Sequence, residues 1–458
     1  MNNLRGKTLR ATGFHAPVCG EIDHFDDSLI RIGADGMIEA VLRSGDDAYE
    51  ETLRSARQSE SLVDLPDDAI LLPGFVDLHI HAPQYPQLGN ALDVPLEVWL
   101  QTYTFPLEAR YADLAFARRS YTVLVDDLLA SGTTTAVYFG TIHDDANRLL
   151  ADLCIEKGQR AFVGRVAMDN PEECPDFYRD AGVAEALTGT AGLIEHIRSH
   201  PDNKDERVRP IVTPRFIPSC TDELLGELGA LAAAHDCTTQ THCSESDWQH
   251  GYVLERHGMT DTESLDRFGL LRSGTVLAHG NFISESDMEK IKVRQSAIAH
   301  CALSNIYFSD AVFPLKSALQ KGLRVGLGTD ISGGPSASMF DSVRSTVSSA
   351  RLLERGTDPA LSREERSRRG DVRIDFREAF HLATAGGGHA VGLPVGSFEV
   401  GQQFDAILVD PDAPRGTIRL WPDLYEGDQI LQTILFNASR ANIASVWVGG
   451  ERRSGHDL

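Results

Sequence analysis

The segment PGFVDLHIHAPQYPQ, residues 73 to 87, joins an apolar run to two histidines and a glutamine. Side chains two residues apart on a β-strand point to the same face, so His79 and His81 share a face if residues 74 to 81 form a strand. Two neutral imidazoles on one face make half of a metal site. The segment therefore predicts a strand whose carboxyl end carries metal ligands.

Further apolar or β-branched runs follow this segment, and longer helical patterns separate them. The eight strand candidates cover residues 74 to 81, 133 to 139, 160 to 168, 208 to 216, 238 to 245, 274 to 280, 296 to 301 and 324 to 330. Strands that alternate with helices indicate a parallel sheet. Polar residues follow the carboxyl ends of several candidates, as in barrel enzymes. We therefore predict an α/β fold with a (β/α)8 TIM-type barrel, in preference to an open doubly wound sheet.

The two ends of the chain have a different pattern. LIRIGADGMIEAV, residues 29 to 41, places Asp-Gly between two alternating apolar stretches, which is typical of a β-hairpin. Residues 396 to 410 and 441 to 453 are also rich in strand formers. Neither end is long enough for a well-buried sheet of its own. We predict one small β-sandwich domain built from residues 1 to 72 and 392 to 458, with the barrel inserted as residues 73 to 391.

Composition narrows the class of partner. The chain has 458 residues and a formal net charge of -24, and such an acidic surface repels phosphate, so we expect neither a nucleic-acid nor a membrane partner. The densest basic run, SREERSRRGDVR from Ser362, is mixed in sign and is expected to be a solvated loop. The seven cysteines form no C-x-x-C pair, and the start of the chain lacks a signal-peptide pattern. These features predict reduced thiols and a cytoplasmic location.

Two more strand candidates end in residues that bind metals. His242 lies near the end of the fifth candidate, and Asp330 ends the eighth. Three histidines and one carboxylate are sufficient for a catalytic Zn²⁺ or Fe²⁺ that keeps one position open. His279, at the end of the sixth candidate, is either a further ligand or a proton carrier. His300, at the end of the seventh, is expected to have a supporting or structural role.

Four other residues indicate catalysis on a flat ring. Glu245 follows His242 by three residues, and a carboxylate so close to a metal site can move a proton between water and a substrate nitrogen. Arg215 can bind a carbonyl with two donors, and Phe216 beside it can stack on a planar ring. Gln84 offers both a donor and an acceptor. Together they predict a flat, nitrogen-rich, uncharged substrate.

The motifs HIH, THCSE, LAHG and GTD, in this order, resemble the amidohydrolase superfamily in its single-metal deaminase branch. More narrowly, HAPQY, YTFPLE and VTPRF are similar to motifs of the guanine deaminase family, and the likeness covers nearly all of residues 70 to 410. The resemblance implies one Zn²⁺ per subunit, with Fe²⁺ as the alternative, bound by His79, His81, His242 and Asp330. It implies substrate contacts by His81, Gln84, Arg215, Phe216, His242, Glu245 and Asp330. It implies catalytic roles for Glu245, His279 and Asp330.

The activity that the resemblance implies is hydrolytic deamination of guanine to xanthine and ammonia in purine catabolism, by a homodimer whose partners are the purine base and water. A related single-metal aminohydrolase acting on 8-oxoguanine, a pterin or an aminotriazine stays open as an alternative. A two-metal ring opener is disfavoured because it needs a lysine where VTPRF has Arg215. A metal-free structural relative is disfavoured because the ligands are all present. The family usually has HCPxSN where this chain has HCALSN, residues 300 to 305, so a locally different loop is expected.

Overall fold

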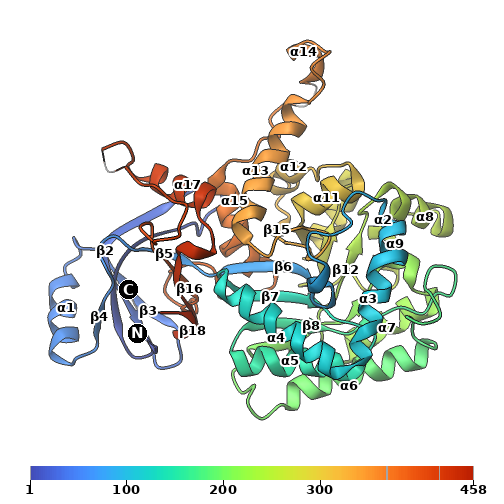
Figure 1. The fold of residues 1–458 in the computed structure, drawn as a ribbon, viewed down its shortest axis with the longest axis horizontal. Helices are drawn as coiled ribbons and strands as arrows, with labels where there is room; N and C mark the ends of the chain where they lie inside the picture. Colours follow the sequence, from blue (N-terminus) through green and yellow to red (C-terminus); the bar gives the residue numbers. More distant parts are fainter. Residues whose placement is uncertain (1, 368–369, 422, 457–458) are drawn as a thin grey trace.

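The computed structural model describes residues 2–367, 370–421 and 423–456, which form a mixed α/β fold (Figure 1). Eight strands of the central segment form two four-stranded parallel sheets. The first has the order β10-β8-β7-β6, and the second has the order β12-β13-β14-β15. Their bounds are β6 (Phe75–His81), β7 (Thr133–Phe139), β8 (Arg160–Gly164), β10 (Val208–Pro210), β12 (Gln240–Cys243), β13 (Val276–His279), β14 (Ala297–His300) and β15 (Arg324–Leu327).

The third and fourth strand candidates differ from the prediction, because each contains two short strands. β9 (Val166–Ala167) and β11 (Thr213–Pro214) pair with each other, separately from β8 and β10. A parallel bridge from Val212 to Thr239 links this region to the second sheet. At the other edge, Asp330 N donates to His79 O at 2.9 Å. The carboxyl ends of strands from both sheets therefore lie beside one another.

Helices flank the parallel strands, as their complete burial requires. Every residue of β6 and β7 is buried. α4 begins after Asp113, whose carboxylate accepts from two amide groups of the first turn, and it buries Leu124 and Leu128. The helices after the strands are α4 (Leu114–Ala130), α5 (Asp144–Lys157), α6 (Val183–Ser199), α7 (Asp222–Ala234), α8 (Asp247–His257), α9 (Asp261–Arg267), α10 (Glu285–Val293), α11 (Ala302–Ser309), α12 (Leu315–Gln320), α13 (Met339–Arg355), α15 (Phe376–Ala383) and α16 (Ala385–Ala390).

Short helical turns connect several of these elements. After β6 come η1 (Ala82–Gln87), α2 (Leu96–Trp99), the π-helical turn η2 (Leu100–Thr104), α3 (Phe105–Ala109) and η3 (Arg110–Ala112). The turn η4 (Ile217–Ser219) follows β11. Part of the basic run near Ser362 is the short helix α14 (Arg363–Arg366), because Ser362 and Glu365 form a capping box. The prediction of a loop was wrong for this part, and residues 368–369 of the run lie outside the described residues.

Strands from both ends of the chain share one eight-stranded sheet, of order β18-β17-β16-β5-β1-β2-β3 with β4 on β1. Its strands are β1 (Thr8–His15), β2 (Asp23–Ile32), β3 (Ile38–Leu42), β4 (Leu62–Asp64), β5 (Ile70–Pro73), β16 (Ala406–Val409), β17 (Ile443–Val448) and β18 (Glu451–Gly455). The helices α1 (Tyr49–Gln58), α17 (Asp428–Asn437) and η5 (Arg440–Asn442) belong to the same two ends. The predicted hairpin is confirmed as the antiparallel pair β2 and β3.

Two details of the terminal regions differ from the prediction. Of residues 396 to 410, only Ala406–Val409 form a strand. β5 ends at Pro73 and pairs with β16, so the shared sheet extends to the first residue assigned to the barrel. The described strands of both ends form this single sheet, and the second layer of a sandwich stays a prediction.

A buried ion pair ties the terminal sheet to the barrel segment. Arg160 donates to both carboxylate oxygens of Asp405, at 3.1 and 3.2 Å, and the Asp405 side chain is fully buried. We expect Asp405→Asn to lower the free energy of unfolding by about 3 kcal/mol, because the guanidinium keeps its charge but loses its partner. Thermal unfolding measures the loss. Asp126→Asn, which breaks the exposed pair with Lys157, is the control and should cost less than about 1 kcal/mol. Equal losses would contradict this expectation.

Candidate active site

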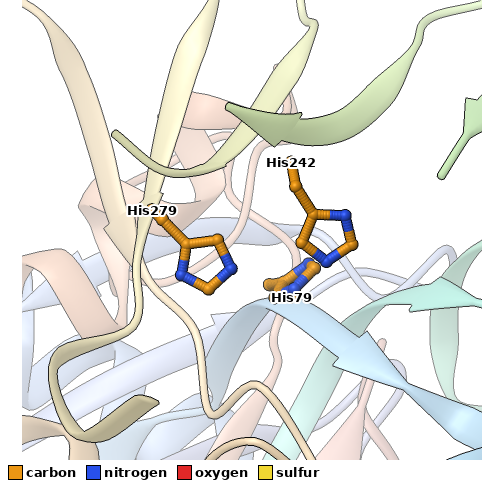
Figure 2. Close-up of side chains that lie close together, drawn as sticks. All are labelled: His79, His242 and His279. Atoms are coloured by element: carbon orange, nitrogen blue, oxygen red, sulfur yellow. The ribbon is translucent and has the colours of Figure 1, made fainter. Parts of the chain in front are cut away.

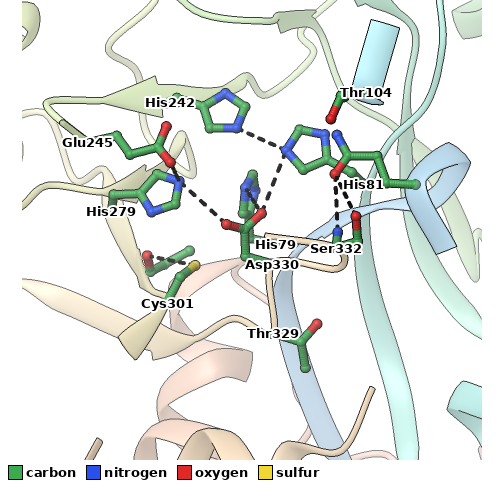
Figure 3. A network of polar contacts seen from close by, with 12 residues as sticks. His79, His81, Thr104, His242, Glu245, His279, Cys301, Thr329, Asp330 and Ser332 are labelled. Carbon is green, nitrogen blue, oxygen red and sulfur yellow. Dashed lines mark hydrogen bonds and ion pairs between the residues drawn. The ribbon is translucent and has the colours of Figure 1, made fainter. Parts of the chain in front are cut away.

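Three histidines and an aspartate, brought together by three of the parallel strands, converge at the carboxyl ends of these strands (Figure 3). His79 and His81 lie on β6, His242 lies on β12, and Asp330 lies three residues after β15. The Nε2 atoms of His81 and His242 are 2.9 Å apart. Asp330 Oδ1 is 3.1 Å from His79 Nε2 and 3.7 Å from His81 Nε2. The predicted ligand set is thus gathered in one buried cluster.

The imidazoles of this cluster are uncharged, which is the protonation state that a metal ligand requires. Burial lowers the pKa of His79, His81 and His242 well below the usual value, so their rings are neutral. His242 Nδ1 lies 2.6 Å from the backbone oxygen of Arg215, which leaves Nε2 with the lone pair. Both ring nitrogens of His79, Nδ1 of His81 and Nε2 of His279 lack a hydrogen-bond partner among the described residues. Buried orphan nitrogens of this kind fit a bound metal ion.

His279 faces the same centre from the end of β13 (Figure 2). Its Nδ1 lies 2.9 Å from Oδ1 of Asn305, so Nδ1 carries the proton and Nε2 has the lone pair. Nε2 is 3.5 Å from Glu245 Oε1 and 3.9 Å from Asp330 Oδ2. Sequence analysis assigned no role to Asn305, which α11 brings under His279. The HCALSN segment opens that helix at Ala302, so the altered motif still supplies this contact.

Glu245 has the environment of a proton donor. Its side chain is 7% exposed, and burial together with the charge of Asp330 raises the pKa of Glu245 well above the usual value. Burial also raises the pKa of Asp330, and His279 partly offsets this increase. Asn281 donates to the backbone oxygen of Glu245 at 2.8 Å and so holds the segment in place. A buried carboxyl group whose pKa is raised holds its proton more firmly than an exposed one and can deliver it to a substrate.

A serine caps the helix that follows Glu245. Ser246 caps α8, because its side chain accepts from Gln249 N at 3.2 Å. Ser244 has a positive φ of 47°, which turns the chain between His242 and the helix. Glu245 therefore precedes the helix and faces the cavity.

The predicted substrate contacts line a single pocket. His81, Gln84, Arg215, Phe216, His242, Glu245 and Asp330 all contribute to its wall. The apolar part of the wall, which sequence analysis missed, consists of Leu96, Trp99, Leu100 and Phe308. These residues come from α2, η2 and α11 and carry no motif of their own. The rings of Trp99 and Phe308 lie 5.0 Å apart and close one side of the cavity.

The metal-type ligands, the buried acid and the enclosed cavity agree with the comparison to known proteins. The model of the Amidohydrolase family matches residues 70–453. This chain belongs to the amidohydrolase family. The resemblance inferred from HIH, THCSE, LAHG and GTD is thereby confirmed.

Several proteins similar to this chain are named guanine deaminase. The guanine deaminase of Dictyostelium discoideum is 33% identical, with 97% of this chain and 98% of its own length aligned. The human guanine deaminase is 37% identical, with 85% of this chain and 84% of its own length aligned. A crystal structure of guanine deaminase from C. acetobutylicum with guanine bound in its active site superposes with a TM-score of 0.86 at 31% identity. It covers 97% of this chain and 99% of its own.

His300 and His143 lie away from the centre of the amidohydrolase site. His300 ends β14, where its ring lies 5.6 Å from that of Phe313, and burial lowers its pKa to about 3. His143 precedes α5 and lies 5.9 Å from the ring of Tyr178. Neither residue lines the cavity.

A titrating histidine lies behind the segment that carries Glu245. His250 Nδ1 is 3.6 Å from Asp261 Oδ2, and this carboxylate raises the pKa of His250 above its ordinary 6.5. A raised pKa in the folded state stabilises the protein most below about pH 6.5, and the contribution is lost as pH rises through the folded pKa. We expect the difference in Tm between the wild type and His250→Gln to be larger at about pH 5.5 than at about pH 8.5. A difference that grows with pH would contradict this sign.

Proposed function

We propose that this amidohydrolase deaminates guanine by hydrolysis, to give xanthine and ammonia in purine catabolism. The observation that carries the proposal is the single cavity that metal-type ligands, a buried acid and the side chain of Arg215 line together. Relatives that align along most of the chain at 31 to 37% identity are named guanine deaminase, and one was solved with guanine in its active site. Hydrolysis of a C–N bond is the reaction class that this family membership supports.

The metal belongs to this proposal. The ligands are His79, His81, His242 and Asp330, and the ion is Zn²⁺, one per subunit, with Fe²⁺ as the alternative. Such an ion lowers the pKa of a water molecule to about 7 and so supplies a nucleophile at neutral pH. Neutral imidazoles and orphan ring nitrogens support this assignment.

The protein residues then handle the protons. Asp330 and His279 take the proton of the attacking water, whose oxygen adds to C2 of guanine. Glu245 donates its proton to a ring nitrogen. It then takes up the proton of the hydroxyl group on C2 and transfers it to the leaving amine, so ammonia departs as the C2–N bond breaks. The proton held by Asp330 and His279 returns to Glu245. Phe216 stacks on the ring, and Arg215 and Gln84 hold its far edge. His81 and His242 contact the ring from the metal side.

The finer architecture is also proposed. The two four-stranded sheets and the β9–β11 pair form one closed (β/α)8 barrel over residues 73 to 391. The Val212–Thr239 bridge and the Asp330–His79 hydrogen bond, at opposite edges, support closure. Residues 1 to 72 and 392 to 458 form the β-sandwich domain. A cytoplasmic homodimer completes the proposal, and sedimentation of the purified protein tests the oligomeric state.

The deciding experiment is ammonia release by the Zn²⁺-loaded protein with guanine, 8-oxoguanine, adenine, cytosine, pterin and an aminotriazine. We expect guanine to be turned over with the highest kcat/KM. Preferred turnover of 8-oxoguanine, pterin or the triazine would support the proposed metal site but would identify that ring as the substrate in place of guanine. No ammonia from any of them would overturn the proposal.

A further inference from the structure

We infer that Glu108 is a positioning residue that holds Arg215 and Gln84 as a wall of hydrogen-bond donors. The site therefore accepts only rings that carry an oxo acceptor at C6 when the amino group that leaves is at C2. The inference rests on the proposed function and deepens it, because it assigns substrate selection to a side chain outside the cavity wall. Glu108 lies on α3 and is not among the residues that line the cavity.

Glu108 is fully buried and has three donors. Its Oε2 accepts from Arg215 Nη1 at 2.6 Å, and its Oε1 accepts from Arg215 Nη2 at 3.1 Å. The same Oε1 accepts from Gln84 Nε2 at 2.8 Å. A carboxylate can only accept, so one ionised side chain sets the orientation of both cavity residues.

The other end of the Gln84 amide is held as well. Its Oε1 accepts from Ser332 N at 3.1 Å and lies 3.4 Å from Ser332 Oγ. A carbonyl oxygen has two lone pairs, and Ser332 occupies both. The remaining group of Gln84 is the second N–H of Nε2. The sequence analysis expected Gln84 to offer a donor and an acceptor, but in this structure only the donor is left for a substrate.

Arg215 likewise presents donors alone. A guanidinium has five N–H groups and no acceptor, and two of these groups are used by Glu108. The guanidinium carbon also lies 5.0 Å from the centre of the Phe105 ring, which holds the plane in position. Arg215 is 2% exposed, so water cannot easily replace a missing substrate acceptor.

A donor wall discriminates between purines that keep the leaving 2-amino group. Guanine has an oxo group at C6 and the ring nitrogen N7 on the same edge, and both accept hydrogen bonds. In 2,6-diaminopurine the group at C6 is an amine, whose N–H atoms would face the donors of Arg215 and Gln84. In 2-aminopurine the C6 substituent is missing, so the donors stay unpaired. The geometry therefore predicts the order guanine, 2-aminopurine, 2,6-diaminopurine.

The wild-type enzyme tests this order without a variant. We expect kcat/KM for 2,6-diaminopurine to be about 10³-fold or more below that for guanine, because buried donors without acceptors reject a ring strongly. Hypoxanthine and adenine, which lack the 2-amino group, serve as inhibitors of guanine turnover. Hypoxanthine should bind at least about tenfold more tightly than adenine. Comparable turnover of guanine and 2,6-diaminopurine would overturn the inferred donor wall but leave the proposed function intact. No turnover of guanine would overturn the proposed function itself.

Glu108→Gln tests the positioning role. The amide introduced at position 108 no longer orients the side chain of Gln84. The amide oxygen of Gln84 can then turn toward a 6-amino group. We expect the ratio of kcat/KM for guanine to that for 2,6-diaminopurine to fall at least about tenfold, with a larger change in KM for guanine than in kcat. Asp405→Asn is the matched control, because it removes another buried bidentate partner of an arginine at a distance from the cavity.

The two variants separate positioning from general loss of stability. Asp405→Asn should keep the wild-type ratio of the two substrates at a temperature where both variants are folded. An unchanged ratio in Glu108→Gln, or an equal fall in both variants, would overturn the role of Glu108. Should Glu108→Gln not fold, the inhibition by hypoxanthine and adenine of the wild type still decides whether the wall consists of donors.

Discussion

Replacing Glu245 by glutamine is expected to lower kcat for guanine by about 10³-fold, the middle of the range for a general acid or base. Glutamine keeps the size and one oxygen of the side chain but has no proton to transfer at the ring nitrogen. Because Glu245 is buried beside Asp330, removal of its ionisable group should not reduce stability. Ammonia release at saturating guanine measures kcat.

The control for this variant is Glu289→Gln, on the exposed side of α10. It makes the same chemical change at a distance from the cavity, and kcat should stay within about twofold of the wild type. The metal content of Glu245→Gln should also stay unchanged, since Glu245 is not one of the proposed ligands. A Glu245→Gln enzyme with wild-type kcat would remove Glu245 from the proton transfer and leave His279 and Asp330 as the remaining groups.

The other large effect is expected from His79→Ala. His79 is fully buried and lies within ligand distance of His81, His242 and Asp330. Its loss leaves two histidines and one carboxylate, and we expect metal affinity to fall at least about 100-fold, since even the outer partners of metal ligands change it by about 10- to 100-fold. Metal content per chain after dialysis, measured by atomic absorption, is the readout, and turnover of guanine should fall with it.

His196→Ala is the matched control, because His196 is a histidine on α6 that pairs with Asp152 outside the cavity. It should keep the full metal content. Retention of the metal by His79→Ala would show that His279 or Glu245 completes the ligand set in its place, since both lie in the other ligand-competent groups of this centre. The assignment of ligands would then change while the metal dependence stayed.

Much of the fold could be predicted because the pattern of a strand is local. β7 begins and ends where the sequence predicts, and β6 differs by one residue, because fully buried parallel strands appear as continuous apolar runs. The split of the third and fourth candidates could not be seen, since it depends on β9 pairing with β11 and not with the strands beside them. The terminal hairpin was visible for the same local reason, through Asp35 and Gly36 at its turn.

The site was predictable in its ligands but not in its supports. A histidine or carboxylate at a strand end is visible in the chain. Glu108 ends the motif YTFPLE, but its partner Arg215 is 107 residues away, so the motif did not reveal its role. The cavity wall at Trp99 and Phe308 is apolar and looks like ordinary core. Asn305 acts only through its contact with His279, so its role could be recognised only from the position of α11 in the structure.

The sequence by itself indicated the α/β class, the family and the kinds of atoms at the proposed metal site. These follow from residue type, from spacing along the strands and from motifs that resemble a known family. Only the tertiary structure decided how distant segments meet. It brought Glu108 to Gln84 and Arg215, and Ser332 to the other end of the Gln84 amide. An amide can present either a donor or an acceptor, and its neighbours in space decide which one is left for the substrate.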